Sequence, residues 1–360
     1  MSRPAPVAPA PERLPTAGAA PHGPPATRRI LVTGSSGFIG SRVAAAARRL
    51  PGARLVVARR SSGPAEKDPA VRYVHADLTD SASLYGVCDG IDIVLHCAAR
   101  VGGPEHSVRA VNEEGTRALL AEAERAGVRR FVQVGTASVY GRGVFRNAGP
   151  EHLPVMPHSP TSRTRAAAER FVLAAGGTVL RPHLVIGAGD RWVVPGLVRL
   201  HQRLAASVDG WQARMSVVDV DDLARAVIAV AVAPQDTSGV WHPNHPEPVG
   251  CARIFDALVR LLGLPAGTGD IEADGARRRL AEHPVLLHHL AMLTTDHWFA
   301  SSRLWRETGC PAGGAFEESL ARHAPWYREH LATDTGGRTG RAGRTGRTGM
   351  PESGRSSGGP

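Results

Sequence analysis

The chain has 360 residues, of which 42% are hydrophobic, so it can fill the core of one large domain or two modest ones and is not wholly disordered. No apolar run is long enough to span a bilayer, and the Pro/Ala-rich start lacks the apolar stretch of a secretion signal. The formal net charge is +10, but Lys67 is the only lysine, and this arginine bias in an Ala-, Gly- and Pro-rich chain indicates genome composition rather than a nucleic-acid surface.

Both ends of the chain are expected to be disordered tails. Residues 1–27 are rich in proline and alanine, and residues 333–360 contain the low-complexity run GGRTGRAGRTGRTG, which cannot bury a core. Because this run has no aromatic residue to stack on bases, we do not expect it to bind nucleic acid. The cysteines lie far apart without a CxxC pair, at Cys88, Cys97, Cys251 and Cys310. We therefore expect no disulfide framework, no metal site and a cytoplasmic location.

Between the tails, short apolar runs alternate with longer amphipathic stretches. In chain order we expect strands at 29–33, 54–58, 71–75, 91–96, 130–134 and 178–180, and helices at 38–50, 106–126 and 160–175. This alternation predicts an α/β fold, a Rossmann-type doubly wound parallel sheet over residues 28–181. After Pro182 the alternation loosens, which indicates a smaller substrate-binding lobe over residues 182–332.

A glycine triplet follows the first expected strand and opens the first expected helix. Gly34 permits a tight turn, Gly37 lets a pyrophosphate approach the backbone, and Gly40 lets the helix pack closely on the sheet. The free N–H groups and positive dipole end of that helix favour phosphates. The expected phosphate-binding residues are Gly34, Ser36, Gly37, Phe38, Ile39 and Gly40.

The second expected strand ends at Ala58-Arg59-Arg60, without an acidic residue. An acid there would bind the ribose 2′-hydroxyl of NAD, whereas two guanidinium groups suit the 2′-phosphate of NADP. The alternative is that Arg59 and Arg60 are ordinary surface arginines. We expect NADP as the cofactor, with NAD as the second choice.

The glycine spacing and six further segments resemble the extended short-chain dehydrogenase/reductase family, also called the NAD-dependent epimerase/dehydratase family. The segments are ADL at 76–78, HCAA at 96–99, NEEGTRALL at 112–120, FVQVGTASVYG at 131–141, LRPHLVIGAGD at 180–190 and VVDVDDLARAV at 217–227. The resemblance implies a Rossmann fold, a nicotinamide cofactor, a small-molecule substrate and a homodimer formed through two helices. It also implies that Asp77 binds the adenine amine, although Asp77 could equally cap the following helix. Further cofactor positions expected from the resemblance are Leu78, Ala98, Ala99 and His183 in these segments, and Arg165 in the segment 159–169.

The family's catalytic residues are a Ser/Thr, a Tyr and a Lys, and this chain departs from that set. By similarity, Thr136 fills the Ser/Thr position, Thr161 stands at the Tyr position and Arg165 at the Lys position. Arg165 is still a cation that can hold ribose hydroxyls. A threonine hydroxyl, however, is a much weaker acid than a phenol, so Thr161 cannot serve as the usual proton donor.

Three explanations of this departure stay open. Another group can supply the proton, with Tyr140 and His158 as candidates, although Tyr140 is usually structural in the family and His158 is more simply a loop histidine. Water with Thr136 and Thr161 can suffice for an easier reaction. Alternatively, the protein binds NADP without catalysis, as a regulatory or accessory protein.

The C-terminal lobe carries few chemical signals. Asp219, Asp221 and Asp222 begin an expected helix, where acids suit the helix N-terminus better than a metal site. Trp192 is our candidate for a substrate-pocket residue. The function that we expect is oxidation, reduction or epimerisation at a hydroxyl or ketone carbon of a nucleotide-sugar, a sterol-like ring or a specialised metabolite, within a biosynthetic pathway.

Overall fold

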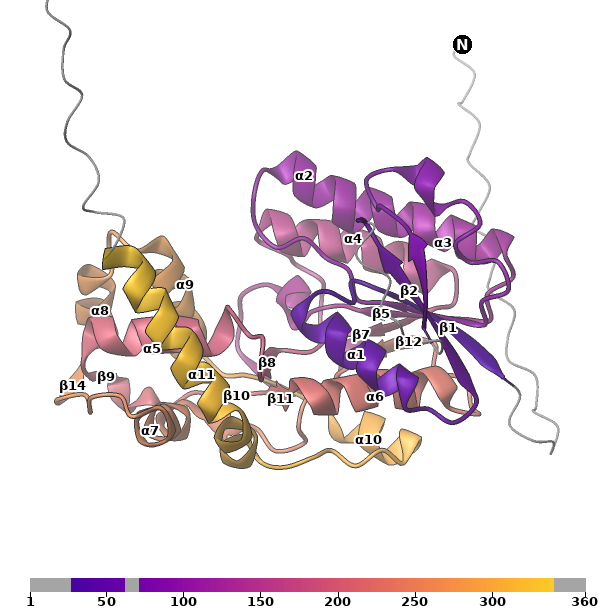
Figure 1. The fold of residues 1–360 in the computed structure, drawn as a ribbon. Helices are drawn as coiled ribbons and strands as arrows, with labels where there is room; N and C mark the ends of the chain where they lie inside the picture. The colour runs from indigo at the N-terminus through magenta and orange to yellow at the C-terminus, as the bar shows by residue number, and fades with distance from the viewer. Residues whose placement is uncertain (1–26, 62–70, 340–360) are drawn as a thin grey trace, which may run out of the picture.

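The first half of the chain contributes six of the seven strands of the parallel sheet that the alternating pattern predicts (Figure 1). The structure is a computed structural model that describes residues 27–61 and 71–339. The seven strands run in the order β12-β7-β5-β4-β1-β2-β3, and every pairing is parallel. Their bounds are β1 (Arg28–Thr33), β2 (Ala53–Arg59), β3 (Val71–His75), β4 (Ile93–His96), β5 (Arg130–Val134), β7 (Thr178–Leu180) and β12 (Gly239–Trp241).

Helices cover both faces of this sheet because its strands are apolar on both sides. In β1, Ile30 and Val32 face the helices α1 (Phe38–Arg48) and α6 (Val220–Val232), whereas Leu31 faces the opposite layer. That opposite layer contains α3 (Gly115–Arg125) and α4 (Pro160–Ala174). The helix expected at 106–126 begins as α2 (Glu105–Arg109) and passes through a π-helical turn, η2 (Ala110–Glu114), before α3. Short 3₁₀ turns are η1 (Ser81–Leu84), η3 (Ala137–Tyr140) and η4 (Pro150–His152).

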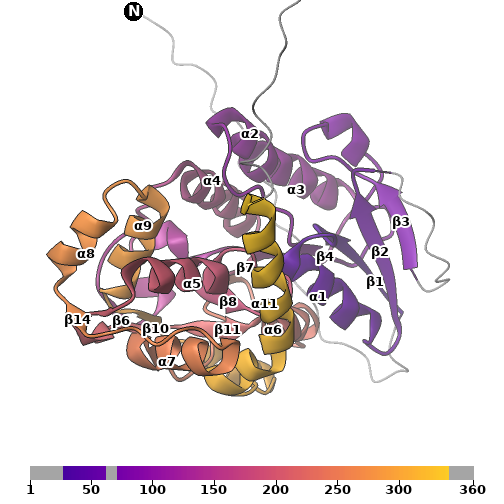
Figure 2. The same cartoon turned by 60° about the vertical axis from the view of Figure 1, so that its left-hand side comes forward.

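The second half of the chain forms a lobe beside the sheet (Figures 1 and 2). Its core packs the helices α5 (Val193–Leu204), α7 (Cys251–Leu262), α8 (Ala273–Arg279), α9 (Pro284–Leu293) and α11 (Phe316–Thr339). A four-stranded sheet combines β13 (Val249–Gly250), β10 (Arg214–Met215), β15 (His297–Phe299) and β6 (Phe145–Ala148). Two small pairs are β11 (Val217–Asp219) with β8 (Leu184–Ile186), and β14 (Asp270–Ile271) with β9 (Ser207–Val208), and the remaining elements are η5 (Asp209–Trp211) and α10 (Ser302–Thr308).

The predicted domain boundary at 181/182 does not match this arrangement. β12 pairs with β7 and completes the Rossmann sheet, and α6 packs on α1, although both follow residue 182. The chain therefore returns from the lobe to the sheet. The sequence does not predict this return, because β12 has only three residues. At the C-terminus, α11 continues to Thr339, past the expected start of the tail at 333. The other predicted tail residues, 1–26 and 340–360, lie outside the described residues.

Four further helix and strand predictions hold to within two residues at their ends, at α1, β2, β4 and α4. In the part of the chain that the structure describes, no helix is both long and apolar enough to cross a bilayer. All four cysteines are unpaired.

Candidate functional site

The loop between β1 and α1 has the backbone shape that the glycine triplet predicts. Gly34 has φ +70°, and the N–H of Gly37 donates to the carbonyl of Gly34 at 2.9 Å. A Cβ on Gly34 would stand 2.6 Å from the backbone nitrogen of Ala98, and a Cβ on Gly40 would stand 2.1 Å from the carbonyl oxygen of Gly34. No side chain caps α1, so its first N–H groups are free for an anion.

A cavity of about 500 Å³ opens directly above this loop, which is the size of a cofactor site. It extends from the glycine loop past the ends of β2, β3 and β4. The structure brings nine of the predicted cofactor residues together as its lining: Gly34, Ser36, Gly37, Arg59, Arg60, Asp77, Leu78, Ala98 and Ala99. Phe38, Ile39 and Gly40 form the first turn of α1 beside it. The residues present thus fit a bound dinucleotide, with phosphates on the glycine loop.

The two arginines at the end of β2 differ in their surroundings. The guanidinium of Arg59 stacks 3.7 Å above the ring centre of Tyr73, while Arg60 is exposed at the cavity edge. Across the cavity, the Asp77 carboxylate accepts hydrogen bonds from the N–H and hydroxyl of Thr79, which lower the pKa of Asp77, and the charge of Arg60 lowers it further. The alternative that Asp77 caps the next helix is wrong, because Asp80 is the N-cap of η1.

Beneath the cavity lies a network of buried, hydrogen-bonded polar side chains for which the sequence predicts no role. His96, 1% exposed, bridges the hydroxyls of Thr33 at 2.7 Å and Thr116 at 2.9 Å. Burial, helped by the charge of Arg165, lowers the pKa of His96 to about 3, so its ring is neutral. The N–H of Arg100 donates to Asn112, which sits in the π-helical turn. These bonds fix the ends of β1 and β4, where the cofactor loop begins. A histidine at the end of the apolar run IDIVLH was the available signal.

The predicted catalytic positions lie at the end of β5 and the start of α4. Thr136 caps η3, and its half-buried hydroxyl accepts from the N–H of Ser138 at 3.2 Å. Thr161 is in the first turn of α4, where its hydroxyl accepts from the N–H of Gly102 at 3.3 Å. Arg165, one turn later, donates to the carbonyl oxygen of Val134 at 2.5 Å. The side chain of Arg165 therefore reaches the strand end that carries Thr136.

The structure does not support Tyr140 as a proton donor. Its side chain is 2% exposed in an apolar cluster with Phe145 and Phe299, and its hydroxyl bonds to Nε2 of His242 at 2.7 Å. Burial raises the pKa of Tyr140 to about 12 despite the nearby Arg181. His158, the second candidate, is exposed and lies beside Gly141, in the loop before α4.

Two further predictions concern His183 as a cofactor residue and Trp192 as a substrate-pocket residue. The ring of His183 packs against His297 and Phe299 of the second lobe, and burial lowers its pKa to about 3. His183 is not among the residues that line the cofactor cavity, because its side chain turns toward β15. Trp192 is 62% exposed and immediately precedes α5.

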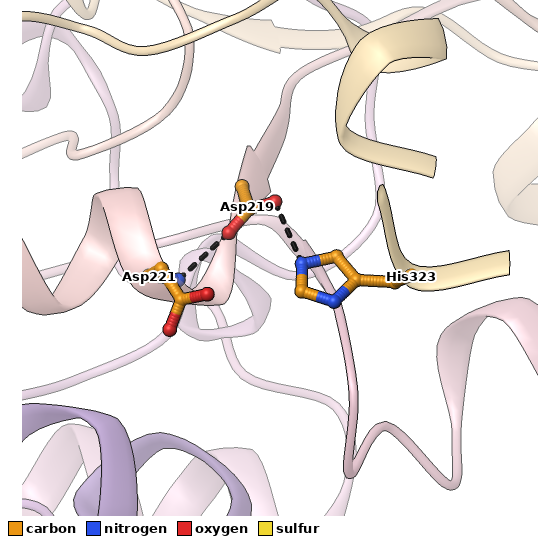
Figure 3. A group of neighbouring side chains, drawn as sticks. All are labelled: Asp219, Asp221 and His323. Atoms are coloured by element: carbon orange, nitrogen blue, oxygen red, sulfur yellow. Dashed lines mark hydrogen bonds and ion pairs between the residues drawn. The ribbon is translucent and has the colours of Figure 1, made fainter. Parts of the chain in front are cut away.

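Asp219, Asp221 and His323 form a close group that could resemble a metal site, with ligand atoms within 4.8 Å of one another (Figure 3). Their hydrogen bonds give a different explanation. Asp219 caps α6 by accepting from the N–H of Asp221 at 2.8 Å, and it accepts from Nε2 of His323 at 2.9 Å. The N–H of Ala188 donates to the other ring nitrogen of His323 at 3.2 Å. Asp219 thus caps a helix whose first turn holds Asp221 and Asp222, so the acids suit the helix N-terminus as predicted, and the histidine ties α11 to the start of α6 and to the loop after β8.

Comparisons with known proteins agree with this geometry. The NAD dependent epimerase/dehydratase family matches residues 30–241. The chain is 28% identical over 325 residues to a 2-alkyl-3-oxoalkanoate reductase of Stenotrophomonas maltophilia, covering 82% of this chain and 98% of that protein. It is 35% identical over 335 residues to a 3 beta-hydroxysteroid dehydrogenase/Delta 5-->4-isomerase of Mycobacterium tuberculosis, covering 83% and 90%.

Among solved structures, MoeE5 in complex with UDP-glucose and NAD superposes with a TM-score of 0.64 at 26% identity, over 84% of this chain and 99% of that one. The glycine loop, the cavity above it and the parallel sheet all lie within the matched residues 30–241. The chain belongs to the NAD dependent epimerase/dehydratase family.

Proposed function

We propose that this protein is an NADP-dependent oxidoreductase that interconverts a hydroxyl and a ketone on an apolar small molecule in a reducing cytoplasm. The observation that carries the proposal is the cavity above the glycine loop. The backbone of Ala98 lies so close to Gly34 that a side chain on Gly34 would clash with it, while the cavity beside both residues has room for a ligand. Arg60 at its edge supports NADP, because an exposed guanidinium can bind a 2′-phosphate with charge-assisted bonds.

The chain's own residues divide the chemistry as follows. When bound, the nicotinamide supplies or accepts the hydride. The hydroxyl of Thr136, at the end of β5, holds and polarises the substrate oxygen. Arg165 brings a fixed positive charge to the same strand end, which favours negative charge developing on that oxygen. With threonine at position 161, the proton comes from water held near Thr136 and Thr161, and the reaction is slower than with a phenol.

An apolar substrate is supported by the exposed side chains around this strand edge. Val101, Met156 and Trp192 are 53%, 58% and 62% exposed, so these apolar side chains are open to contact with a substrate. Val101 adjoins Gly102, the partner of Thr161. The backbone N–H of Met156 is bonded to Val139 in the turn that Thr136 caps.

The third of these residues is linked to the cofactor loop. The loop before Trp192 packs on α1, since a Cβ on Gly189 would stand 3.0 Å from the ring of Phe38. The reductase and the steroid dehydrogenase are named for a 2-alkyl-3-oxoalkanoate and a hydroxysteroid, both of which have large apolar parts.

The test is a thermal-shift titration with NADPH and NADH side by side, followed by turnover at 340 nm. The substrate panel contains alkyl ketones of rising chain length, ketosteroids and a keto-sugar nucleotide. We expect stabilisation by NADPH at lower concentration than by NADH, and turnover that rises with chain length. Turnover of the sugar nucleotide and of no other panel member would refute the apolar substrate class but would still support an oxidoreductase.

The second candidate is a catalytically silent NADP-binding protein, which Thr161 favours. It predicts stabilisation by NADPH with no turnover of any panel member, and no gain on Thr161→Tyr. An increase in turnover with Thr161→Tyr would instead identify a weak enzyme that lacks only the phenol.

A further inference from the structure

A buried ion pair lies directly behind the predicted catalytic residues and has no part in the chemistry above. Glu169 of α4 is 1% exposed, and Arg181, just after β7, is 4% exposed. Nε of Arg181 donates to Oε2 of Glu169 at 2.9 Å, and Nη2 of Arg181 forms an ion pair with the same oxygen at 2.9 Å. One oxygen of Glu169 thus serves Arg181, and the other is directed elsewhere.

That second oxygen faces the strand end that carries Thr136. A Cβ on Gly135 would stand 2.3 Å from Oε1 of Glu169, so only glycine fits there. Burial raises the pKa of Glu169, and Oε1 itself has no hydrogen-bond partner among the described residues. On its other edge, this segment is held by the N–H of Ala137 donating to Pro182 at 2.8 Å. Glu169 therefore closes the segment from the side of α4.

The same carboxylate lies between two cations. Glu169 follows Arg165 by four residues on α4, so both side chains project from one face of the helix, and their charges interact. Arg165 bonds to Val134 and Glu169 packs against Gly135, so α4 contacts the two residues that precede Thr136. A buried ion pair is by itself a weak source of stability, since apolar residues of equal volume do as well. Its placement calls for another explanation.

We propose that Glu169 is a positioning residue, which fixes the backbone of Thr136 and holds Arg165 and Arg181 in place beneath the site of hydride transfer. The proposal rests on the proposed function, in which Thr136 and Arg165 act on the substrate. Glu169 touches neither the substrate nor the cofactor. Glu169 carries the negative charge between Arg165 and Arg181, and its second oxygen packs against Gly135, so a neutral side chain cannot replace it in both respects.

The experiment compares Glu169→Gln with Glu122→Gln in the full-length protein. Glu122 is a matched control, because it is 6% exposed on α3, pairs with Arg125 and also accepts from the N–H of Gly86 at 2.9 Å, but it does not contact the strand end at Thr136. Two measurements are made on each: amide hydrogen exchange over residues 134–138, and kcat and KM with the ketone that the wild type reduces. Chemical denaturation gives the stability of each variant.

We expect both variants to lose stability, but only Glu169→Gln to raise exchange over residues 134–138 and to lower kcat about tenfold with KM nearly unchanged, a loss of transition-state stabilisation alone. Glu169→Asp, which keeps the charge but is shorter, should recover stability without recovering kcat. If Glu169→Gln does not fold, the double variant Glu169→Gln/Arg181→Gln, which removes the unpaired charge of Arg181, takes its place.

Wild-type exchange and kcat in a folded Glu169 variant would overturn the proposal. The exchange measurement needs neither cofactor nor substrate. A wild type that fails to bind NADPH would therefore refute the proposed function separately, while exchange still decides whether Glu169 holds Thr136.

Discussion

Gly40→Ala is the sharpest test of the cofactor site because the structure allows its cost to be worked out. The new Cβ would stand 2.1 Å from the carbonyl oxygen and 2.6 Å from the carbonyl carbon of Gly34. Both are backbone atoms of the cofactor loop, so no side chain can rotate away, and loop and helix must separate by about 1 Å or more to reach normal contact.

Overpacking of this kind costs about 1–3 kcal/mol, and the upper end applies when backbone must move. Alanine regains about 1 kcal/mol through its helix propensity, so the net loss is about 2 kcal/mol. A loss of that size lowers the melting temperature by about 3 °C in a chain of this length. Since the N–H groups of the displaced loop would no longer meet the phosphates, the Kd for NADPH should rise about tenfold or more, measured by NADPH fluorescence.

Gly275→Ala is the matched control, because Gly275 lies within α8 and the nearest atom to its Cβ would be Nη2 of Arg278, at 3.8 Å. This variant should be more stable than the wild type by about 0.5–1 kcal/mol and bind NADPH normally. The reasoning would be refuted if Gly40→Ala bound NADPH with the wild-type Kd and melted together with Gly275→Ala.

Three other perturbations test other parts of the site. Arg60→Ala should raise the Kd for NADPH about tenfold and leave that for NADH nearly unchanged, since it removes one charge-assisted contact to the 2′-phosphate; equal effects on both cofactors would exclude that contact. Thr136→Val should lower kcat about tenfold or more, whereas Thr136→Ser, which keeps the hydroxyl, should retain most of it; equal activity of the two variants would exclude the hydroxyl. Burial raises the pKa of Asp219, but the hydrogen bond from His323 and other contacts outweigh it and hold the pKa below its ordinary value of 3.8. The Asp219 carboxylate therefore stabilises the fold above pH 3.8, and this stabilisation is lost as pH falls through the folded pKa. Asp219→Asn should thus be less stable than the wild type in urea at pH 7, and a difference that does not shrink below pH 3.8 would contradict this account.

The Rossmann half of the fold could be predicted because its signals are local. Apolar strands and the glycine triplet follow one another within a few residues, and each constrains its own backbone. β12 was missed because its three residues gain their place only by pairing with β7, 61 residues earlier at Thr178↔Gly239. The same limit applies to the direction of a side chain, since nothing local indicates that His183 turns toward β15.

The cofactor half of the candidate site could likewise be located from sequence, whereas its supporting layer could not. Gly34 and Asp77 carry recognisable motifs, and both line the cavity. Arg181 lies in a segment that resembles the family, but the sequence does not indicate its pairing with Glu169, because this pairing is a contact between a helix and a strand end. Tyr140 illustrates the opposite error, because a motif suggested a chemical group that packing has buried.

The two departures from the family's catalytic set have a common physical consequence. A lysine beside a tyrosine serves partly to lower the pKa of the phenol, and with Thr161 there is no phenol to adjust. Arginine keeps its charge at any working pH and binds carbonyl groups through a planar fork, so Arg165 is suited to a fixed bond such as the one to Val134. A fixed cation needs a fixed counter-charge in a buried site, and Glu169 is the carboxylate within reach. We therefore expect each of Arg165 and Glu169 to need the other for its position. Arg165→Lys should lower kcat by more than the loss of its one hydrogen bond to Val134 would explain.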